Sequence, residues 1–448
     1  MLILGQTTIT GGNITSTDGS GIYCFNTVNI SGNSTNITGK TNGIAVISGT
    51  TTVIGGNITS TESAGIALGN GSNESTLNLG ANDSTVSTTS PRITGVTYGV
   101  DVRRYTTFNF YDGVIIGATN QSISKEPNAI PDDCEILKTN TATQETAILR
   151  KLPILLSGAN FNAAIKGTTW NTDNTDIKSI TFGKTSQYFS NSIVPGIESV
   201  TPIPVDVDRA GTINAYKLGD ATDGYDVYVL SDAKIFANED ASYMFNAFTG
   251  LASVDVSVLD TSKVTDMTKM FAGSRKVTGS AVQHVRHEGN IKILNLSNFD
   301  TSNVTSMYGM FAYQVSLESV NLSSFDTSNV TRMDEMFNAC TSLTTLDLSN
   351  FNTSNVTNMD GMFTCLISDP QNGLFLYYNN STTTRSSLTT IYVSDLWDIS
   401  KVRGETTIAS RMFNDCVSLV GAISYDSSKT NKEYANYETG YLTYKSNT

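Results

Sequence analysis

A Met-Phe pair recurs in the second half of this chain at intervals that centre on 26 residues. The pairs begin at Met244, Met270, Met310, Met336, Met362 and Met412. Three of the five intervals are 26 residues, and the other two, 40 and 50 residues, equal one period plus insertions of 14 and 24. A fixed period of this length indicates a repeat architecture, in which each unit packs only against its neighbours.

Each 26-residue unit also has its own internal pattern. The copies that begin at Leu317 and Leu343 show the Leu-x-x-Leu-x-Leu spacing of a strand whose inward side chains stack from unit to unit. An Asp-Thr-Ser-Asn segment then offers capping side chains. Val330, Met333 and Met336 follow at intervals of three, on one face of a short helix or 3₁₀ turn. We therefore expect a strand, a capped turn and a short amphipathic helix per unit.

A weaker repeat precedes this one. The string Gly-Gly-Asn-Ile-Thr-Ser-Thr occurs at 11–17 and at 55–61, and a Gly-Ile pair occurs at Gly21, Gly43 and Gly65, two successive shifts of 22. Short alternating strands separated by Gly, Asn and Ser turns cannot bury their apolar side alone. Stacking such units at the strand spacing of about 4.8 Å would bury it. The pattern predicts a β-solenoid of about five coils.

The changes of pattern divide the chain into four parts. The segment 120–147 breaks the first repeat and carries Pro127 and Pro131, which favours a linker. In chain order we expect a β-solenoid over 1–119, the linker over 120–147, a β-rich lead-in or capping domain over 148–240, and a leucine-rich-repeat-like array with a C-terminal cap over 241–448. The predicted fold class is a repeat solenoid, mainly β with short helices.

Charge and composition exclude several classes of protein. A net charge of −13 argues against a nucleic-acid binder, because phosphates require a basic face. No apolar run reaches about 18 residues, so no transmembrane helix or membrane insertion is expected. The cysteines are odd in number and far apart, which fits neither a disulfide scaffold nor a zinc motif. They are Cys24, Cys134, Cys340, Cys365 and Cys416.

The 26-residue unit resembles the BspA-like leucine-rich repeats of bacterial surface proteins. The match is closest over Leu346–Phe363, Leu-Asp-Leu-Ser-Asn-Phe-Asn-Thr-Ser-Asn-Val-Thr-Asn-Met-Asp-Gly-Met-Phe. The segment 234–245 resembles the start of such arrays, and 425–435 with 440–443 resembles their terminal unit. The resemblance implies an extracellular or cell-surface location, adhesion, and no catalytic activity or cofactor. No signal peptide or anchor is visible, so we expect a fragment of a longer exported protein.

Two groups of residues have the composition of metal sites. His284 and His287, followed by Glu288, could hold a metal, but an exposed loop in the insertion between repeats is the simpler interpretation. Asp206 and Asp208, with the segment Asp220–Asp226, form an acidic cluster, but this cluster lacks the ligand order of an EF-hand and reads as a solvated turn. We predict no metal site.

Two further groups have the composition of reactive sites. Asp101, Arg103, Arg104, Tyr105 and Asp112 lie at the end of the first repeat, where a polysaccharide lyase or hydrolase would need acidic groups on one coil face. An ordinary terminal coil is the simpler interpretation. Among the cysteines, 340 and 416 share one repeat position and 365 falls one residue short of it. Buried thiols are expected, and a bridge between 340 and 365 is the alternative.

The outward strand positions of the array form the candidate binding face. These positions and their flanks are Asp255, Asn295, Asn321, Asp347 and Tyr392, with Glu318 and Thr344. Solenoids bind across such sheet surfaces, although Asn and Asp side chains also form ladders that only stabilise the stack. We expect a non-catalytic surface or secreted protein that binds a host or bacterial protein or glycan. The alternatives are a carbohydrate-active enzyme on the first repeat and a purely structural stalk.

Overall fold

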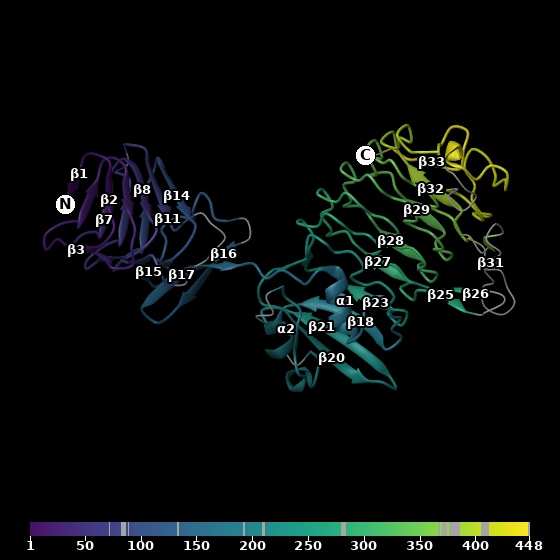
Figure 1. The fold of residues 1–448 in the computed structure, drawn as a ribbon, viewed down its shortest axis with the longest axis horizontal. Helices are drawn as coiled ribbons and strands as arrows, with labels where there is room; N and C mark the ends of the chain where they lie inside the picture. The colour runs from purple at the N-terminus through teal and green to yellow at the C-terminus, as the bar shows by residue number, and fades with distance from the viewer. Residues whose placement is uncertain are drawn as a thin grey trace. The chain divides into compact units, whose positions relative to one another are not determined.

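The computed structural model describes the chain in two compact units, Met1–Leu152 and Pro153–Thr448. The described residues are 1–70, 72–81, 87, 89–131, 134–190, 193–207, 211–278, 284–365, 368–369, 374–375, 386–404 and 412–446. Both units are mainly β, with parallel strands stacked in sheets (Figure 1). No helix in these residues is long and apolar enough to cross a bilayer.

The first unit consists of three parallel sheets, and each pass of the chain, here called a coil, adds one strand to each sheet. The first sheet holds β1 (Leu2–Ile3), β4 (Ile22–Cys24), β7 (Ile44–Val46), β10 (Ile66–Leu68) and β13 (Val100–Val102). The second holds β2 (Thr7–Ile9), β5 (Val28–Ile30), β8 (Gly49–Val53), β11 (Ser75–Leu79) and β14 (Thr106–Phe110). The third begins with β3 (Gly12–Thr15), β6 (Thr35–Gly39), β9 (Asn57–Ser60), β12 (Arg92–Thr94) and β15 (Val114–Ala118).

Alternation along these strands explains the core of the first unit. Ile22, Ile44 and Ile66 occupy equivalent positions in the first sheet and are fully buried. In β4, Tyr23 lies between the buried Ile22 and Cys24 and faces outward. Gly21 and Gly43 precede these isoleucines at points where a Cβ atom would lie within 3 Å of the next coil. The 22-residue Gly-Ile signal is therefore a packing requirement.

The expected linker over 120–147 is wrong. Two antiparallel strands, β16 (Cys134–Asn140) and β17 (Gln144–Lys151), extend the third sheet from β15. Cys134, Ala147 and Leu149 are buried in the core of the first unit. The prolines interrupt the repeat, but the chain after them still alternates apolar and polar residues, and this hairpin covers the last coil.

The second unit opens with a five-stranded mixed sheet that leads into the array. The sheet order is β19 (Ile203–Pro204), β20 (Asn214–Asp220), β21 (Gly224–Leu230), β18 (Ile177–Gly183) and β23 (Ser253–Asp255). The same part of the chain also contains three helices, α1 (Gly158–Lys166), α2 (Thr185–Ser190) and the 3₁₀ helix η1 (Ile197–Ser199). Because β23 belongs to the first array repeat and pairs with β18, the lead-in sheet continues into the array.

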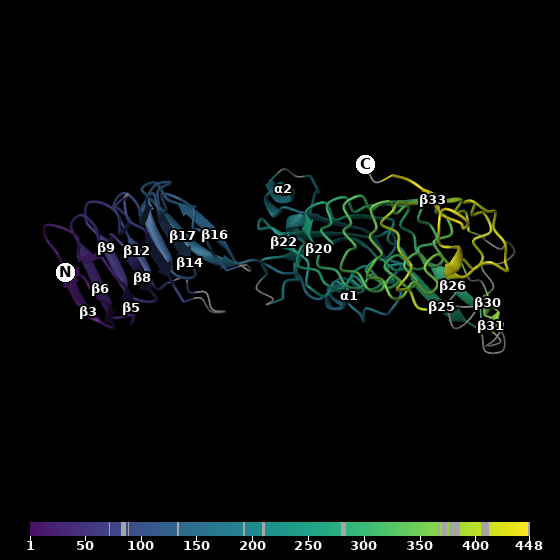
Figure 2. The ribbon, with the colours of Figure 1, turned by 90° about the horizontal axis from the view of Figure 1, so that it is seen from above.

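Short strands repeat along the array (Figure 2). The paired sets are β22 (Ile235–Phe236) with β24 (Leu259–Asp260), β27 (Ile293–Asn295) with β28 (Ser319–Asn321), and β29 (Thr345–Asp347) with β32 (Thr390–Val393) and β33 (Thr443–Tyr444). The insertions contain the hairpins β25 (Ser274–Thr278) with β26 (His284–Glu288) and β30 (Ser368–Asp369) with β31 (Leu374–Phe375). A 3₁₀ turn, η4 (Lys432–Tyr434), precedes β33.

The Met-Phe pairs form the core of the array. Their phenylalanine rings stack from repeat to repeat with centroids 5.0–6.1 Å apart, and all are buried. The stack is Phe245, Phe271, Phe311, Phe337, Phe363 and Phe413. The insertions of 14 and 24 residues leave this stack continuous, because they leave and rejoin the coil between one pair and the next.

The short helix expected around each Met-Phe pair is absent from the described array repeats, where turns replace it. Where it is described, the residue before the methionine has a positive φ, 62° at Tyr243, 52° at Lys269 and 55° at Glu335, with glycine at two further copies. A left-handed residue interrupts a helix. Alternate N–H groups of the segment also bond the next coil, as Met307, Gly309 and Phe311 do, and so cannot bond within a helix.

Backbone hydrogen bonds from the turn segments, such as 307–313, run forward to the following coil, whereas the threonine before each segment donates back, as the Thr331 N–H does to the Thr305 carbonyl. The forward bonds leave carbonyls of the first coil and N–H groups of the last coil to be paired outside the repeats. One face of α1 caps the first coil. The Gly158 N–H bonds the Asp240 carbonyl, Asn162 bonds three carbonyls between Tyr243 and Asn246, and the buried Lys166 ammonium bonds the Asn246 carbonyl at 2.8 Å.

At the other end of the array, acceptors outside the repeats cap the free N–H groups. Phe413 donates to the Thr430 carbonyl at 2.9 Å, and Asp415 donates to the Tyr425 hydroxyl at 3.1 Å. The array is therefore closed chemically at both ends by segments that do not repeat.

In the Asp-Thr-Ser-Asn segment, the Thr and Asn side chains bond neighbouring coils, and the Asp and Ser side chains bond each other. In the copy at 300–303, the Asp300 carboxylate accepts the Ser302 N–H and hydroxyl. The buried Thr301 hydroxyl donates forward to the Asp326 carbonyl at 2.8 Å and accepts the Asp326 N–H at 2.9 Å. Asn303 donates back to the Ser262 carbonyl at 2.8 Å. The motif is thus more than a helix cap, because it joins three coils.

Candidate binding face

The candidate binding face is the outward side of the short array strands. Asp255, Asn295, Asn321 and Asp347 are exposed on β23, β27, β28 and β29, and Tyr392 on β32 is half-buried. The backbone register aligns Asn295 with Asn321 and Asp347 with Tyr392. The five predicted side chains therefore occupy equivalent outward positions of successive repeats.

Much of the hydrogen-bonding capacity of this column serves the fold. The Oδ1 atom of each Asp or Asn accepts the N–H of the serine two residues later, at 3.0–3.2 Å. The Asn321 Nδ2 atom also donates to the Asn295 Oδ1 atom at 3.1 Å. These bonds fix the side chains in an Asx turn, and the outer oxygen of Asp347 also pairs with Lys445. A ligand would therefore bind the polar atoms of the column that these contacts do not use.

The flanking positions are also exposed. Glu318 pairs with Lys292 at 3.3 Å, with both side chains more than half exposed, so the contact contributes little stability. Thr344 is exposed on the same stretch of chain as Thr345. Ile293, two residues before Asn295, is 68% exposed. The face therefore combines polar groups with a single large apolar side chain.

A tyrosine cluster at the end of this face was missed from the sequence. The Tyr437 and Tyr444 rings lie 5.1 Å apart, and their hydroxyls donate to opposite oxygens of Asp395 at 3.3 and 3.2 Å. Lys445 pairs with Asp347, and its ammonium lies 5.6 Å from the Tyr392 ring centroid. The alternating Tyr-Leu-Thr-Tyr-Lys segment at 441–445 was the available signal.

The charges in this cluster fix its protonation states. The hydrogen bond to Asp395 raises the pKa of Tyr444, and the Asp347 carboxylate raises the pKa of Lys445. Near neutral pH the tyrosines are therefore neutral donors and the lysine is charged. Tyr444 is 47% exposed, so one side of its ring faces solvent.

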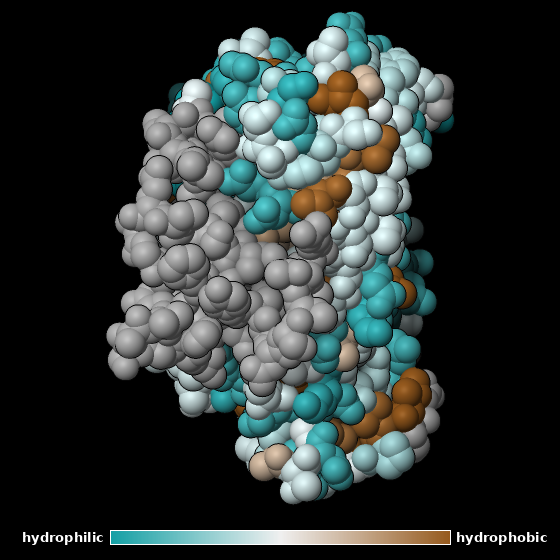
Figure 3. Space-filling model, turned by 90° about the vertical axis from the view of Figure 1, so that its right-hand side faces the viewer, coloured by the Kyte–Doolittle hydropathy of each residue, from teal (hydrophilic) through white to brown (hydrophobic). Residues whose placement is uncertain are grey.

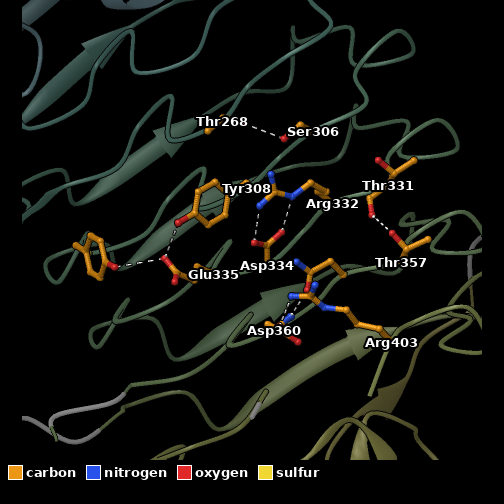
Figure 4. A network of polar contacts seen from close by, with 12 residues as sticks. Thr268, Ser306, Tyr308, Thr331, Arg332, Asp334, Glu335, Thr357, Asp360 and Arg403 are labelled. Atoms are coloured by element: carbon orange, nitrogen blue, oxygen red, sulfur yellow. Dashed lines mark hydrogen bonds and ion pairs between the residues drawn. The ribbon is translucent and has the colours of Figure 1, made fainter. Parts of the chain in front are cut away.

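A second polar network covers the turn segments of the array (Figure 4). Arg332 binds Asp334 through two nitrogen atoms, at 3.1 and 2.9 Å, and lies 4.8 Å from the Tyr308 ring centroid. The hydroxyls of Tyr308 and Tyr313 both donate to Glu335. Burial, with the Glu335 charge second, raises the pKa of Tyr308 to about 12. The groups bond one another across repeats, which indicates a structural role.

The apolar residues on the array end that faces the viewer in Figure 3 occur as small patches separated by hydrophilic residues. Exposed apolar side chains of the array include Ile293, Leu396, Val420 and Tyr444. Scattered apolar residues of this kind are normal on a protein surface. The polar and aromatic groups of the candidate face are therefore its distinguishing feature.

The acidic cluster forms turns. The Asp220 carboxylate accepts the N–H groups of Thr222 and Asp223 in the β20–β21 hairpin, and the Asp223 N–H, with that of Thr222, lowers the pKa of Asp220. The buried Asp206 carboxylate accepts two N–H groups from Gly211 and Thr212. Asp208 lies outside the described residues.

The histidines lie on the β25–β26 hairpin of the first insertion, and their backbone pairs with Arg275 and Thr278. The structure does not describe the side chains of His284 and His287. The described part of the chain contains no group of three His, Cys, Asp or Glu residues placed to hold a metal ion.

The residues considered for a carbohydrate-active site end the first unit. Arg103 pairs with Asp101 at 3.3 Å, and Tyr105 is 68% exposed with a φ of 61°. Asp112 accepts the Gly113 N–H at 2.7 Å. The two carboxylates therefore bond different parts of the chain, one an arginine side chain and the other a turn.

All five cysteines are buried free thiols. Burial raises the pKa of Cys24 to about 11. The Cys340 sulfur donates to the Phe311 carbonyl at 3.1 Å, inside the array core.

The fold and the face define a class: a mainly β repeat protein whose outward strand positions are polar and fixed. The family model described as Mycoplasma protein of unknown function, DUF285, matches residues 239–285 and 279–372. These residues contain the first repeats of the array and the start of its second insertion. No curated protein and no solved structure matches the chain.

Proposed function

We propose that this chain is a non-catalytic surface or secreted repeat protein, similar to the BspA-like leucine-rich-repeat proteins, that binds a protein or glycan. In this proposal both units are solenoids. The first acts as a spacer, and the second contacts the ligand through the outward face of its strands. The location is extracellular or at a bacterial cell surface.

The observation that carries the proposal is the rigid polar column with a tyrosine cluster at its end. Tyrosine contributes a large contact area at a low cost in conformational entropy. The Asp395 carboxylate holds Tyr437 and Tyr444 in place before any ligand arrives. A preorganised group of this kind loses less entropy on binding.

The structural stalk is the second candidate, and one observation favours it. The Oδ1 atom of each Asp and Asn in the column already bonds its own chain, so the ladder has a stabilising role without a ligand. A stalk predicts that no glycan or matrix protein binds the face.

The test is a binding screen of the full chain against glycan and extracellular-matrix protein arrays. For a ligand found there, Tyr444→Ala is expected to weaken binding about tenfold or more, as for a hot-spot aromatic residue. Tyr105→Ala is the matched control, because Tyr105 is also exposed but belongs to the first unit. Equal affinity of the two variants would place the ligand elsewhere, and a folded chain that binds nothing would favour the stalk.

A further inference from the structure

Two of the buried cysteines lie next to each other at the end of the array. Cys365 follows the Met362–Phe363 pair, and Cys416 follows the Met412–Phe413 pair of the next repeat. The two segments are joined by backbone hydrogen bonds, Phe363 N–H to the Met412 carbonyl at 3.1 Å and Cys365 N–H to the Asn414 carbonyl at 2.9 Å. The cysteines therefore lie on adjacent coils that are in direct contact.

Both sulfur atoms approach the same oxygen atom. The Cys416 Sγ atom donates to the Phe363 carbonyl at 3.0 Å, and the Cys365 Sγ atom lies 3.7 Å from that oxygen. The Cys340 sulfur, by contrast, bonds the Phe311 carbonyl of an earlier repeat. The geometry therefore selects the 365–416 pair over the 340–365 bridge that the sequence leaves open.

We propose that Cys365 and Cys416 form an intrachain disulfide bond in an oxidising environment, with a low-molecular-weight disulfide such as glutathione disulfide as the oxidant. The Cys365 thiolate attacks one sulfur of glutathione disulfide, whose S–S bond breaks and releases one glutathione thiolate. The Cys416 thiolate then attacks the Cys365 sulfur of the mixed disulfide and releases the second glutathione. Two electrons pass from the cysteines to the oxidant, and the two thiol protons are taken up by the glutathione thiolates.

The surroundings of the two sulfur atoms indicate which cysteine attacks the oxidant first. The hydrogen bond from Cys416 lowers the pKa of Cys365, whereas burial raises the pKa of Cys416. Cys365 is thus the first nucleophile, because the thiolate is the attacking species. Cys365 also immediately precedes the second insertion, while Cys416 lies in the stack that closes the array.

The disulfide would join the last Met-Phe repeat to the preceding one. It would close the chain loop from 365 to 416, which contains the second insertion and β32. A crosslink across a long loop restricts the unfolded chain more than the folded one. Oxidation is therefore expected to stabilise the C-terminal end of the array, whatever ligand the face binds.

The experiment treats the full chain with glutathione disulfide, both in the native state and during refolding from denaturant. Free thiols are then alkylated, and the intact mass and the non-reduced peptides are measured. We expect two thiols to become resistant to alkylation, a peptide linking Cys365 to Cys416, and reversal by dithiothreitol. The thermal midpoint of the second unit should rise by about 5 °C.

Two variants separate this pair from the neighbouring thiol. Cys416→Ser should abolish the linked peptide and the thermal shift, while Cys340→Ser should retain both. Five alkylatable thiols after both treatments, or a peptide linking Cys340 to Cys365, would overturn the proposal.

Discussion

In the first unit, backbone groups make most of the bonds between coils, whereas in the array side chains make many of them. The strands of the first unit pair in three parallel sheets, and β11 alone aligns five residues with β14. The array strands outside the insertions are two to four residues long. Its coils depend on bonds such as Thr301 to the Asp326 backbone and Asn303 to the Ser262 carbonyl.

This difference explains why the 22-residue repeat of the first unit is weakly conserved from copy to copy in the sequence, whereas the 26-residue repeat of the array is strongly conserved from copy to copy. A backbone ladder accepts almost any side chain outside the core, so the first unit must repeat only its glycines and inward apolar residues. A side-chain bond requires a particular residue at each copy. The Asp-Thr-Ser-Asn motif therefore recurs because its Thr and Asn side chains bond neighbouring coils and its Asp and Ser side chains hold the turn between them.

The Asp and Asn residues of the polar column on the candidate face also recur because each makes a side-chain hydrogen bond. Their Oδ1 atoms hold the turn that follows each strand. A position of the column that does not carry Asp or Asn is therefore more informative about ligand binding. Tyr392 replaces the Asp or Asn at the last copy and adjoins the tyrosine cluster, which is why the cluster is our preferred contact point.

The largest effect is expected at the α1 cap, which pairs the carbonyls of the first array coil. Lys166→Met removes donors to three carbonyls, those of Trp170, Thr172 and Asn246, at 2.8–3.0 Å. Each hydrogen bond from the charged ammonium contributes about 1 kcal/mol or more, so the free energy of unfolding should fall by about 3 kcal/mol. Hydrogen exchange should accelerate in the array and not in the first unit.

The control for this variant is Lys178→Met, which removes an exposed lysine with a single carbonyl partner, Thr175. It should change exchange in the array very little. Equal effects of the two substitutions would show that the array does not depend on the cap.

A smaller difference is expected between two asparagines whose side chains bond neighbouring coils. Asn329→Ala removes a bond of 2.7 Å to the Ser302 carbonyl of the preceding repeat. Asn36→Ala removes ladder bonds to Asn13 and Asn57 in the first unit, where backbone pairing holds the coils together. We expect a loss of about 1 kcal/mol for Asn329 and less for Asn36, measured by hydrogen exchange of the affected coils. A larger loss at Asn36 would contradict the comparison.

The smallest effect is expected on the thermal stability of the array at low pH. The Ser400 N–H lowers the pKa of Asp398, and the Ser428 hydroxyl lowers the pKa of Asp426, each from 3.8. A carboxylate whose pKa is lower in the folded state stabilises the fold above its unfolded pKa. That stabilisation is lost as the pH falls through the folded pKa. The array should therefore lose thermal stability below about pH 4 in wild type, and less in Asp398→Asn.

The sequence predicted the periods, the inward residues and the outward column, because these depend on alternation and spacing along one coil. It did not predict the hairpin over 134–151, where prolines hid a pattern that continues after them. The helix around the Met-Phe pairs was also wrong, because hydrogen bonds to the next coil override a spacing of three. The Tyr437–Asp395–Tyr444 cluster joins distant segments, so the alternating pattern at 441–445 could indicate a strand but not its partners.

The most direct test of the account compares two buried threonines. Thr301→Val removes a hydroxyl that bonds both the N–H and the carbonyl of Asp326. Thr51→Val in the first unit removes one that bonds no backbone group among the described residues. We expect Thr301→Val to lower the free energy of unfolding of the array by about 2 kcal/mol, and Thr51→Val to leave that of the first unit unchanged or higher. Equal losses, measured by native-state hydrogen exchange in each unit, would contradict the claim that the array depends on side-chain bonds between coils more than the first unit does.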